Sequence, residues 1–278
     1  MFLVKRICNR IQVPLSKAYA TNLKQIEVTH EESTGITTIS MSRQPVNGLN
    51  KELLNALNTS LLDAQKNRST GVILTSSLPS VFSAGLDIME MYNRTESQMT
   101  EYWQTLQDTW LTLYSLEMPV AAAINGASPA GGCLLALSCE YRVFVEGNHT
   151  IGLNETQLGI PVPKWFKNLY IDVIGYRKAE LACLRGSLFS PKEALKHGLV
   201  DELVAGKADA ISRCQNYIKD FKYISPIGRS RTKLSLRELN LLWMKDNRNM
   251  DLNDFLSFIQ SPKVQAGLKL YIESLKRK

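Results

Sequence analysis

Short apolar runs separated by polar segments predict alternating strands and helices in the first part of the chain. Residues 25–31 and 36–41 are two β-prone runs joined by a Ser-Thr-Gly segment, which predicts a hairpin. Asn50 then precedes leucines at helical spacing, so we expect a capped helix over 51–66, followed by a buried strand over 71–76. This strand–helix–strand order is typical of a crossover unit in an α/β fold.

The same alternation continues toward the middle of the chain. The runs 119–124 and 141–145 predict two more buried strands, with a buried helix between them. Before them lies a long segment with an apolar stripe at helical spacing, which we expect in the core rather than against a cofactor. The stripe consists of Met99, Trp103, Leu106, Trp110 and Leu113. From Pro161 onward the spacing is helical, including a face with Leu252, Phe255, Leu256 and Ile259.

Length and composition fit an ordinary globular protein. The chain has 278 residues, of which 44% are hydrophobic and 21% are charged, and these values exclude collagen, a coiled-coil rod and wholesale disorder. Its five cysteines are scattered and form no C-x-x-C pair, so we expect neither a disulfide framework nor a structural zinc site. We divide the chain into a leader over residues 1–20, a core domain over 21–206 and a helical region over 207–278.

The leader is basic and has no acidic residue before Glu27, which is typical of a mitochondrial transit peptide. A disordered basic N-terminus is the alternative. Its apolar runs are too short for a membrane span. Four of the 33 basic residues of the chain lie in the leader, so its removal leaves 29 against 26 acidic residues, a net charge of +3. This small excess gives little support for nucleic-acid binding.

A second group of basic residues lies near the C-terminal end of the chain. Arg229, Arg231, Lys233 and Arg237 alternate with the apolar residues Leu234 and Leu236. We expect this group on the solvent-facing side of a helix.

Two glycine-containing segments, 81–87 and 125–132, each follow a buried strand. Their small residues would let a ligand approach the main chain closely. The second segment also opens a helix, whose first N–H groups have no partners within the helix. Together the two segments could form a two-donor oxyanion hole, although glycines before a helix are more often a simple turn.

Glu155 lies in the otherwise uncharged window 151–160, between apolar neighbours such as Leu153 and Leu158. Burial of a carboxylate raises its pKa, so this glutamate could serve as a general base that holds a proton. The alternative is a solvent-facing glutamate at the start of a loop or helix.

The strings FSAGLD, NGASPAGGCLLALSCEYR and GLNETQLGI closely resemble the motifs of the crotonase (enoyl-CoA hydratase/isomerase) superfamily, and residues 22–278 follow that family in order and approximate length. The resemblance implies an α/β fold, a spiral of repeated ββα units with a C-terminal helical region that forms homotrimers. It also implies an acyl-CoA thioester held between two backbone N–H groups. The residues that it assigns to the substrate are Ala84 and Gly131 as these donors, Gly85, Leu86, Asp87 and Ile88 along the acyl-CoA path, and Asn154 beside the substrate.

One departure from the family pattern bears on the reaction. Hydratases of the family carry two glutamates, and the positions that match them here are Leu134 and Glu155. A single base can still move one proton from C2 to C4, which converts 3-cis- or 3-trans-enoyl-CoA into trans-2-enoyl-CoA. The resemblance therefore implies an isomerase of fatty-acid β-oxidation in the mitochondrial matrix, without metal or cofactor beyond the CoA of the substrate. The alternatives are a weak hydratase, a thioester hydrolase, or a non-catalytic scaffold that binds RNA or protein.

Overall fold

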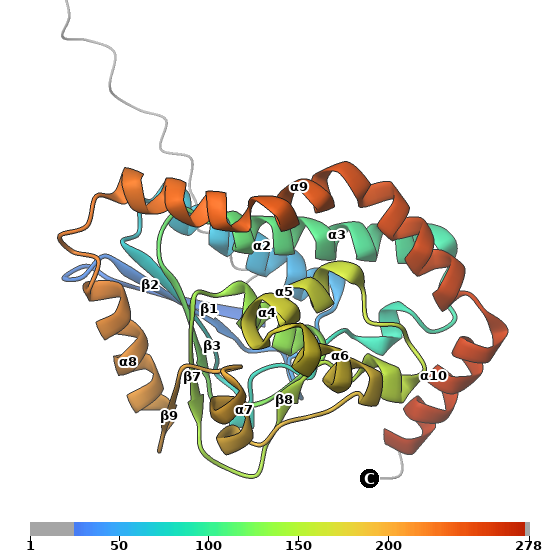
Figure 1. Cartoon of the computed structure of the whole chain (residues 1–278). Helices are drawn as coiled ribbons and strands as arrows, with labels where there is room; N and C mark the ends of the chain where they lie inside the picture. The colour runs from blue at the N-terminus through green and yellow to red at the C-terminus, as the bar shows by residue number, and fades with distance from the viewer. Residues whose placement is uncertain (1–24, 276–278) are drawn as a thin grey trace, which may run out of the picture.

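The computed structural model describes residues 25–275, which form two β-sheets and the helices that cover them (Figure 1). The leader lies outside the described residues. The large sheet has the order β1-β2-β3-β5-β7-β9, antiparallel between β1 and β2 and parallel elsewhere. Its strands are β1 (Ile26–Glu31), β2 (Ile36–Met41), β3 (Gly71–Ser76), β5 (Val120–Ile124), β7 (Tyr141–Val145) and β9 (Glu202–Val204). The small parallel sheet contains β4 (Ser80–Val81), β6 (Gly126–Pro129) and β8 (Ile151–Gly152).

Three successive units each contribute one strand to the large sheet, one strand to the small sheet and then a helix. In the first unit α3 (Glu96–Ser115) follows β3, β4 and the short helix η2 (Ile88–Glu90). In the second, α4 (Gly131–Ser138) follows β5 and β6. In the third, η3 (Glu155–Leu158) and α5 (Lys164–Ile174) follow β7 and β8. Parallel strands end at the same edge of a sheet, so the three connections lie together, and the predicted fold of repeated ββα units is confirmed.

Side-chain caps begin several of the remaining helices, including the helix predicted over 51–66. Helix α2 (Lys51–Lys66) follows Asn50, whose Oδ1 accepts a hydrogen bond from the Leu53 N–H at 3.0 Å. Helix α7 (Pro191–His197) begins with a capping box between Ser190 and Glu193. The other helices are α6 (Tyr176–Arg185), α8 (Lys207–Lys219), α9 (Pro226–Ile259) and α10 (Pro262–Leu275).

The large sheet is covered on both faces. Alternate side chains of a strand point to opposite faces, so Leu74 and Phe144 join the main core formed with α2, α3 and α4. Ile73 and Val143 instead pack in a second cluster with Cys214 and its neighbours on α8. The apolar stripe predicted for α3 is buried along its whole length.

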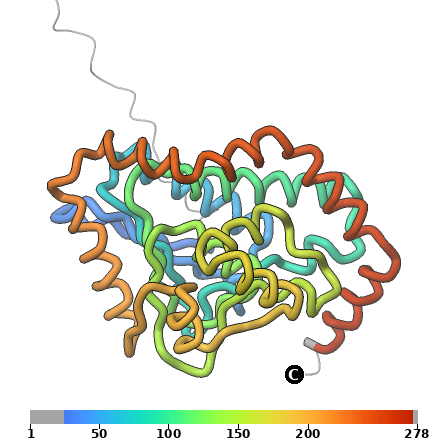
Figure 2. Tube along the Cα trace, in the orientation of Figure 1, coloured from blue at the N-terminus to red at the C-terminus, as the bar shows by residue number. Residues whose placement is uncertain are grey.

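Helix α9 runs along α3 on the outside of the molecule (Figures 1 and 2). A buried polar contact joins them: Asp251 accepts hydrogen bonds from Trp103 Nε1 at 2.7 Å and from Gln107 Nε2 at 2.8 Å. Phe255 stacks on the Trp103 ring with the centroids 4.0 Å apart. The C-terminal helical region therefore packs closely on the core.

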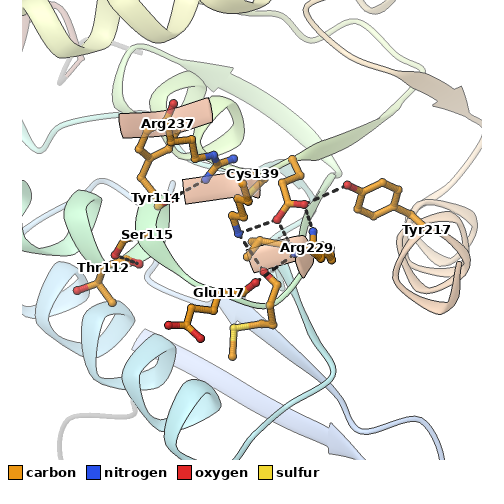
Figure 3. A network of polar contacts seen from close by, with 12 residues as sticks. Thr112, Tyr114, Ser115, Glu117, Cys139, Tyr217, Arg229 and Arg237 are labelled. Carbon is orange, nitrogen blue, oxygen red and sulfur yellow. Dashed lines mark hydrogen bonds and ion pairs between the residues drawn. The ribbon is translucent and has the colours of Figure 1, made fainter. Parts of the chain in front are cut away.

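Three members of the basic group of α9, Arg229, Lys233 and Arg237, point inward, so the prediction that the group faces solvent is wrong for them and holds only for the exposed Arg231 (Figure 3). Lys233 is 7% exposed and binds Glu140 at 2.6 Å and the Met118 carbonyl at 2.9 Å. Burial lowers the pKa of Lys233 to about 8. Arg229 also pairs with Glu140, and Arg237 donates to the Tyr114 carbonyl at 2.7 Å. These cations pair with a half-buried carboxylate and with carbonyl groups near the C-terminal end of α3, where positive charge is favoured.

Candidate active site

The connections that follow β3, β5 and β7 meet at one edge of the large sheet. They carry the segments 84–88, 129–132 and 153–155, and the small sheet holds them in register. A backbone hydrogen bond of 2.8 Å from the Ala130 N–H to the Gly152 carbonyl joins the second segment to the third. The three motifs found in the sequence therefore converge at one place in the fold.

Two backbone amides of this edge lie side by side without acceptors. A Cβ placed on Gly131 would lie 3.2 Å from the Leu86 nitrogen, and one placed on Gly85 would lie 3.1 Å from the Gly131 nitrogen. Within residues 25–275, neither the Leu86 nor the Gly131 N–H donates to a protein acceptor. Gly131 is also the first residue of α4, whose first N–H groups have no partner inside the helix. The pair can therefore hold an oxygen that develops negative charge.

Ala84 does not supply one of these donors. Its N–H donates to the Val46 carbonyl at 2.9 Å, which contradicts the assignment made from the resemblance. Gly85, at a φ of +89°, turns the chain, and the Leu49 amide binds the Gly85 carbonyl at 2.8 Å. An amide of this segment that has no acceptor in the described part of the chain is that of Leu86, two residues later. The sequence alone does not point to Leu86, because the Val46 carbonyl that accepts the Ala84 N–H comes from a distant segment of the chain.

The backbone before α4 is strained. Ala130 has φ +50° and ψ −118°, a conformation that a residue with a side chain rarely adopts. Such strain persists where the surrounding structure enforces it, and it is frequent at functional sites. Next to it, Gly132 lets the first segment approach closely, because a Cβ there would lie 2.5 Å from the Ser83 carbonyl oxygen. The local geometry thus depends on small residues in this turn.

Glu155 begins η3 and is 5% exposed, so the predicted burial is confirmed. Neither of its carboxylate oxygens has a hydrogen-bond partner in the described part of the chain. Burial raises the pKa of Glu155 to about 7, close to the value that suits a group which both takes and returns a proton. Burial, together with the nearby Glu155 charge, also raises the pKa of the Cys133 thiol. Cys133 is therefore a neutral neighbour of Glu155.

The remaining residues assigned to the substrate have different surroundings. Asn154 is half-buried, and its side-chain oxygen is buried with no hydrogen-bond partner among residues 25–275. Asp87 pairs with Arg43 at 2.7 Å and caps η2 by accepting from the Met89 N–H at 3.0 Å. Its carboxylate therefore holds the first segment in place. Ile88 packs partly buried against the main core.

The sequence of the chain matches the enoyl-CoA hydratase/isomerase family over residues 31–278. The chain belongs to this family. It is 43% identical over 257 residues to the mitochondrial enoyl-CoA delta isomerase 1 of Mus musculus, covering 92% of this chain and 89% of that protein. The crystal structure of the human mitochondrial delta3-delta2-enoyl-CoA isomerase is 40% identical and has a TM-score of 0.88, covering 91% of this chain and 98% of that one. An enoyl-CoA hydratase from Bacillus halodurans, at 20% identity and a TM-score of 0.80, shares the fold.

Membership of the enoyl-CoA hydratase/isomerase family confirms the resemblance seen in the three motifs. Leu134 is fully buried in α4, so an alkyl group occupies the position that the resemblance matched to the first glutamate of the hydratases. Glu155 is thus the only carboxylate at the two matched positions.

In the described residues, no group of three or more His, Cys, Asp or Glu side chains is arranged to hold a metal ion. None of the helices between residues 25 and 275 is long and apolar enough to cross a membrane.

Proposed function

We propose that the chain is an enoyl-CoA delta isomerase that converts 3-cis- and 3-trans-enoyl-CoA into trans-2-enoyl-CoA in fatty-acid β-oxidation. The observation that carries this proposal is the buried carboxylate of Glu155, which has no hydrogen-bond partner among residues 25–275 and a pKa near 7. The convergence of its segment with the two unpartnered amides of Leu86 and Gly131 supports it. The relatives named as isomerases share the fold over almost the whole chain.

The two amides would bind the thioester carbonyl oxygen. Removal of a proton from C2 of a 3-enoyl thioester places negative charge on this oxygen as the dienolate forms. Hydrogen-bond donors that are already in position stabilise this charge without reorganisation, and one such donor typically contributes ~3–4 kcal/mol to the barrier. The Leu86 and Gly131 N–H groups, which have no acceptor among the described residues, are free to take this role.

Glu155 would carry the proton. Its carboxylate takes the proton from C2, becomes a neutral carboxylic acid, and returns the proton to C4, so that the double bond moves from C3–C4 to C2–C3. A pKa near 7 lets the same group act as a base in the first transfer and as an acid in the second at neutral pH. The proposed reaction needs no cofactor or metal, because CoA is part of the substrate and the protein supplies both the base and the donors.

We also propose that the protein is a homotrimer in the mitochondrial matrix. The trimer follows from the family resemblance, and an exposed apolar face on α9 supports it: Leu236 is 83% exposed and Leu239 is 84% exposed. Apolar side chains grouped in this way on a surface usually mark an interface. The location follows from the names of the mitochondrial relatives and from the basic leader.

Replacement of Leu236 and Leu239 by glutamate is expected to dissociate the oligomer, because two charges would then have to be buried at the interface. Sedimentation velocity measures this directly. The matched control is Leu62→Glu on α2, which is 50% exposed outside this face and should leave the oligomer intact. An unchanged sedimentation coefficient in the α9 variant would rule out this face as the interface.

The reaction is tested with 3-hexenoyl-CoA and the purified protein, following the trans-2-hexenoyl-CoA product. We expect isomerisation to exceed hydration of crotonyl-CoA by about 10²-fold or more, since a missing second acid–base group costs ~10²–10⁴ in rate. Comparable rates for the two reactions would identify a hydratase instead. A folded protein that binds CoA thioesters but does not isomerise 3-hexenoyl-CoA would contradict the proposal.

A further inference from the structure

A large cavity lies at the edge of the large sheet opposite the candidate active site. Its volume is ≈ 950 Å³. Ile36 begins β2, Thr70 precedes β3 and Pro119 precedes β5, so the cavity adjoins the starts of these strands. The segments with Leu86 and Gly131 follow the opposite ends of β3 and β5. The cavity is therefore separate from the site that would carry out the isomerisation.

The interior of the cavity is mainly hydrocarbon. Its apolar lining comes from the sheet edge, the turn before β5, the end of α8 and the start of α9. The residues are Ile36, Met118, Pro119, Ile218, Phe221 and Ile227. Small-molecule sites are typically lined in this way, and their volumes are ~300–1,000 Å³. The cavity is thus large enough for a long alkyl chain.

Positive charge gathers around the cavity. Arg68, Lys219, Lys222 and Arg229 line it together with one acid, Glu117, and Arg229 is paired with Glu140. Lys219 also lies in the field of Glu31. In the part of the chain that the structure describes, Arg68 and Lys222 enter no ion pair. An apolar interior beside unpaired cations favours an amphiphile with an anionic head.

We propose that this cavity binds a long-chain fatty acid, with the alkyl chain against Phe221 and Ile218 and the carboxylate near Arg68, Lys219 and Lys222. Charge-assisted hydrogen bonds between these cations and the carboxylate would fix the head group. Burial of the chain against the apolar lining would supply most of the affinity. This is a second ligand site, and it does not depend on the reaction at Glu155.

The test is a titration of the delipidated protein with palmitate by isothermal calorimetry. We expect one palmitate per chain, binding equally to wild type and to Glu155→Gln. The double variant K219E/K222E should weaken binding at least about tenfold, a loss of ~1.4 kcal/mol. The control K192E/K196E on α7 makes the same change in net charge away from the cavity and should bind as the wild type does.

Two further ligands separate the contribution of the charged head group to binding from that of the alkyl chain. Hexadecanol carries the same chain without the charge and should bind more weakly than palmitate, whereas hexanoyl-CoA should not displace palmitate. Equal binding of palmitate and hexadecanol would overturn the role of the cations. Displacement by hexanoyl-CoA would place palmitate in the active site, and absence of palmitate binding would overturn the proposal altogether.

Discussion

Glu155→Gln is expected to lower the kcat of isomerisation by about 10²–10⁴-fold, the usual contribution of a general acid–base group. The amide keeps the size of the side chain but cannot take a proton from C2. Because the Leu86 and Gly131 amides remain in place, the affinity for the thioester should change little. Steady-state rates with 3-hexenoyl-CoA measure kcat, and a direct binding titration with hexanoyl-CoA measures the affinity. A variant with near-normal kcat would exclude Glu155 as the base.

The same substitution should stabilise the protein at alkaline pH. The pKa of Glu155 is raised in the folded protein from 4.5 to about 7, so the folded state binds the proton more tightly than the unfolded state does. Stability associated with this group is therefore fully present below pH 4.5 and is lost as the pH rises to about 7. A shift of this size corresponds to about 3 kcal/mol. Glutamine carries no charge, so the stability of the Glu155→Gln variant should not fall in this pH range.

Denaturant unfolding of wild type and Glu155→Gln at pH 5 and pH 8 measures this pH-dependent loss of stability. We expect Glu155→Gln and wild type to differ little at pH 5 and the variant to be more stable at pH 8. The activity of the wild type should show the complementary dependence, with kcat/KM rising through pH 7 as the carboxylate loses its proton. If the stability difference were the same at both pH values, the buried glutamate would not have a raised pKa.

Gly132→Ala is expected to lower kcat by about 10²–10³-fold, the typical cost of one lost oxyanion-hole donor. The added Cβ would lie 2.5 Å from the Ser83 carbonyl oxygen, a backbone atom that can move only with its segment. This segment carries Leu86, so its N–H would move away from the Gly131 N–H. Rates with 3-hexenoyl-CoA measure the loss, and circular dichroism shows whether the fold is kept.

Gly267→Ala on α10 is the matched control, because, apart from the adjacent backbone of α10, no atom of the described residues lies within 4 Å of a Cβ placed there. It should leave kcat unchanged and stabilise the helix by up to ~1 kcal/mol, the usual difference between alanine and glycine. If Gly132→Ala keeps both the fold and full activity, the contact between Ser83 and α4 does not position the donors.

The elements that the sequence predicts correctly depend on neighbours close in the chain. The Asn50 cap and the apolar stripe of α3 each follow from residues a few positions apart, and local spacing is sufficient to place them. The burial of Glu155 could also be predicted, because a lone charge among apolar residues has no local partner. The three motifs identified the segments that form the site.

What the sequence alone could not decide depends on partners distant along the chain. The Ala84 amide is occupied by Val46, and only this contact moves the predicted donor to Leu86. Similarly, Lys233 points inward because Glu140 and the Met118 carbonyl lie opposite, although its local pattern is equally compatible with a solvent-facing helix. Local sequence thus determined which residues form helices, strands and turns. The tertiary structure decided which N–H groups and charges are free, because this depends on the groups that folding brings against them.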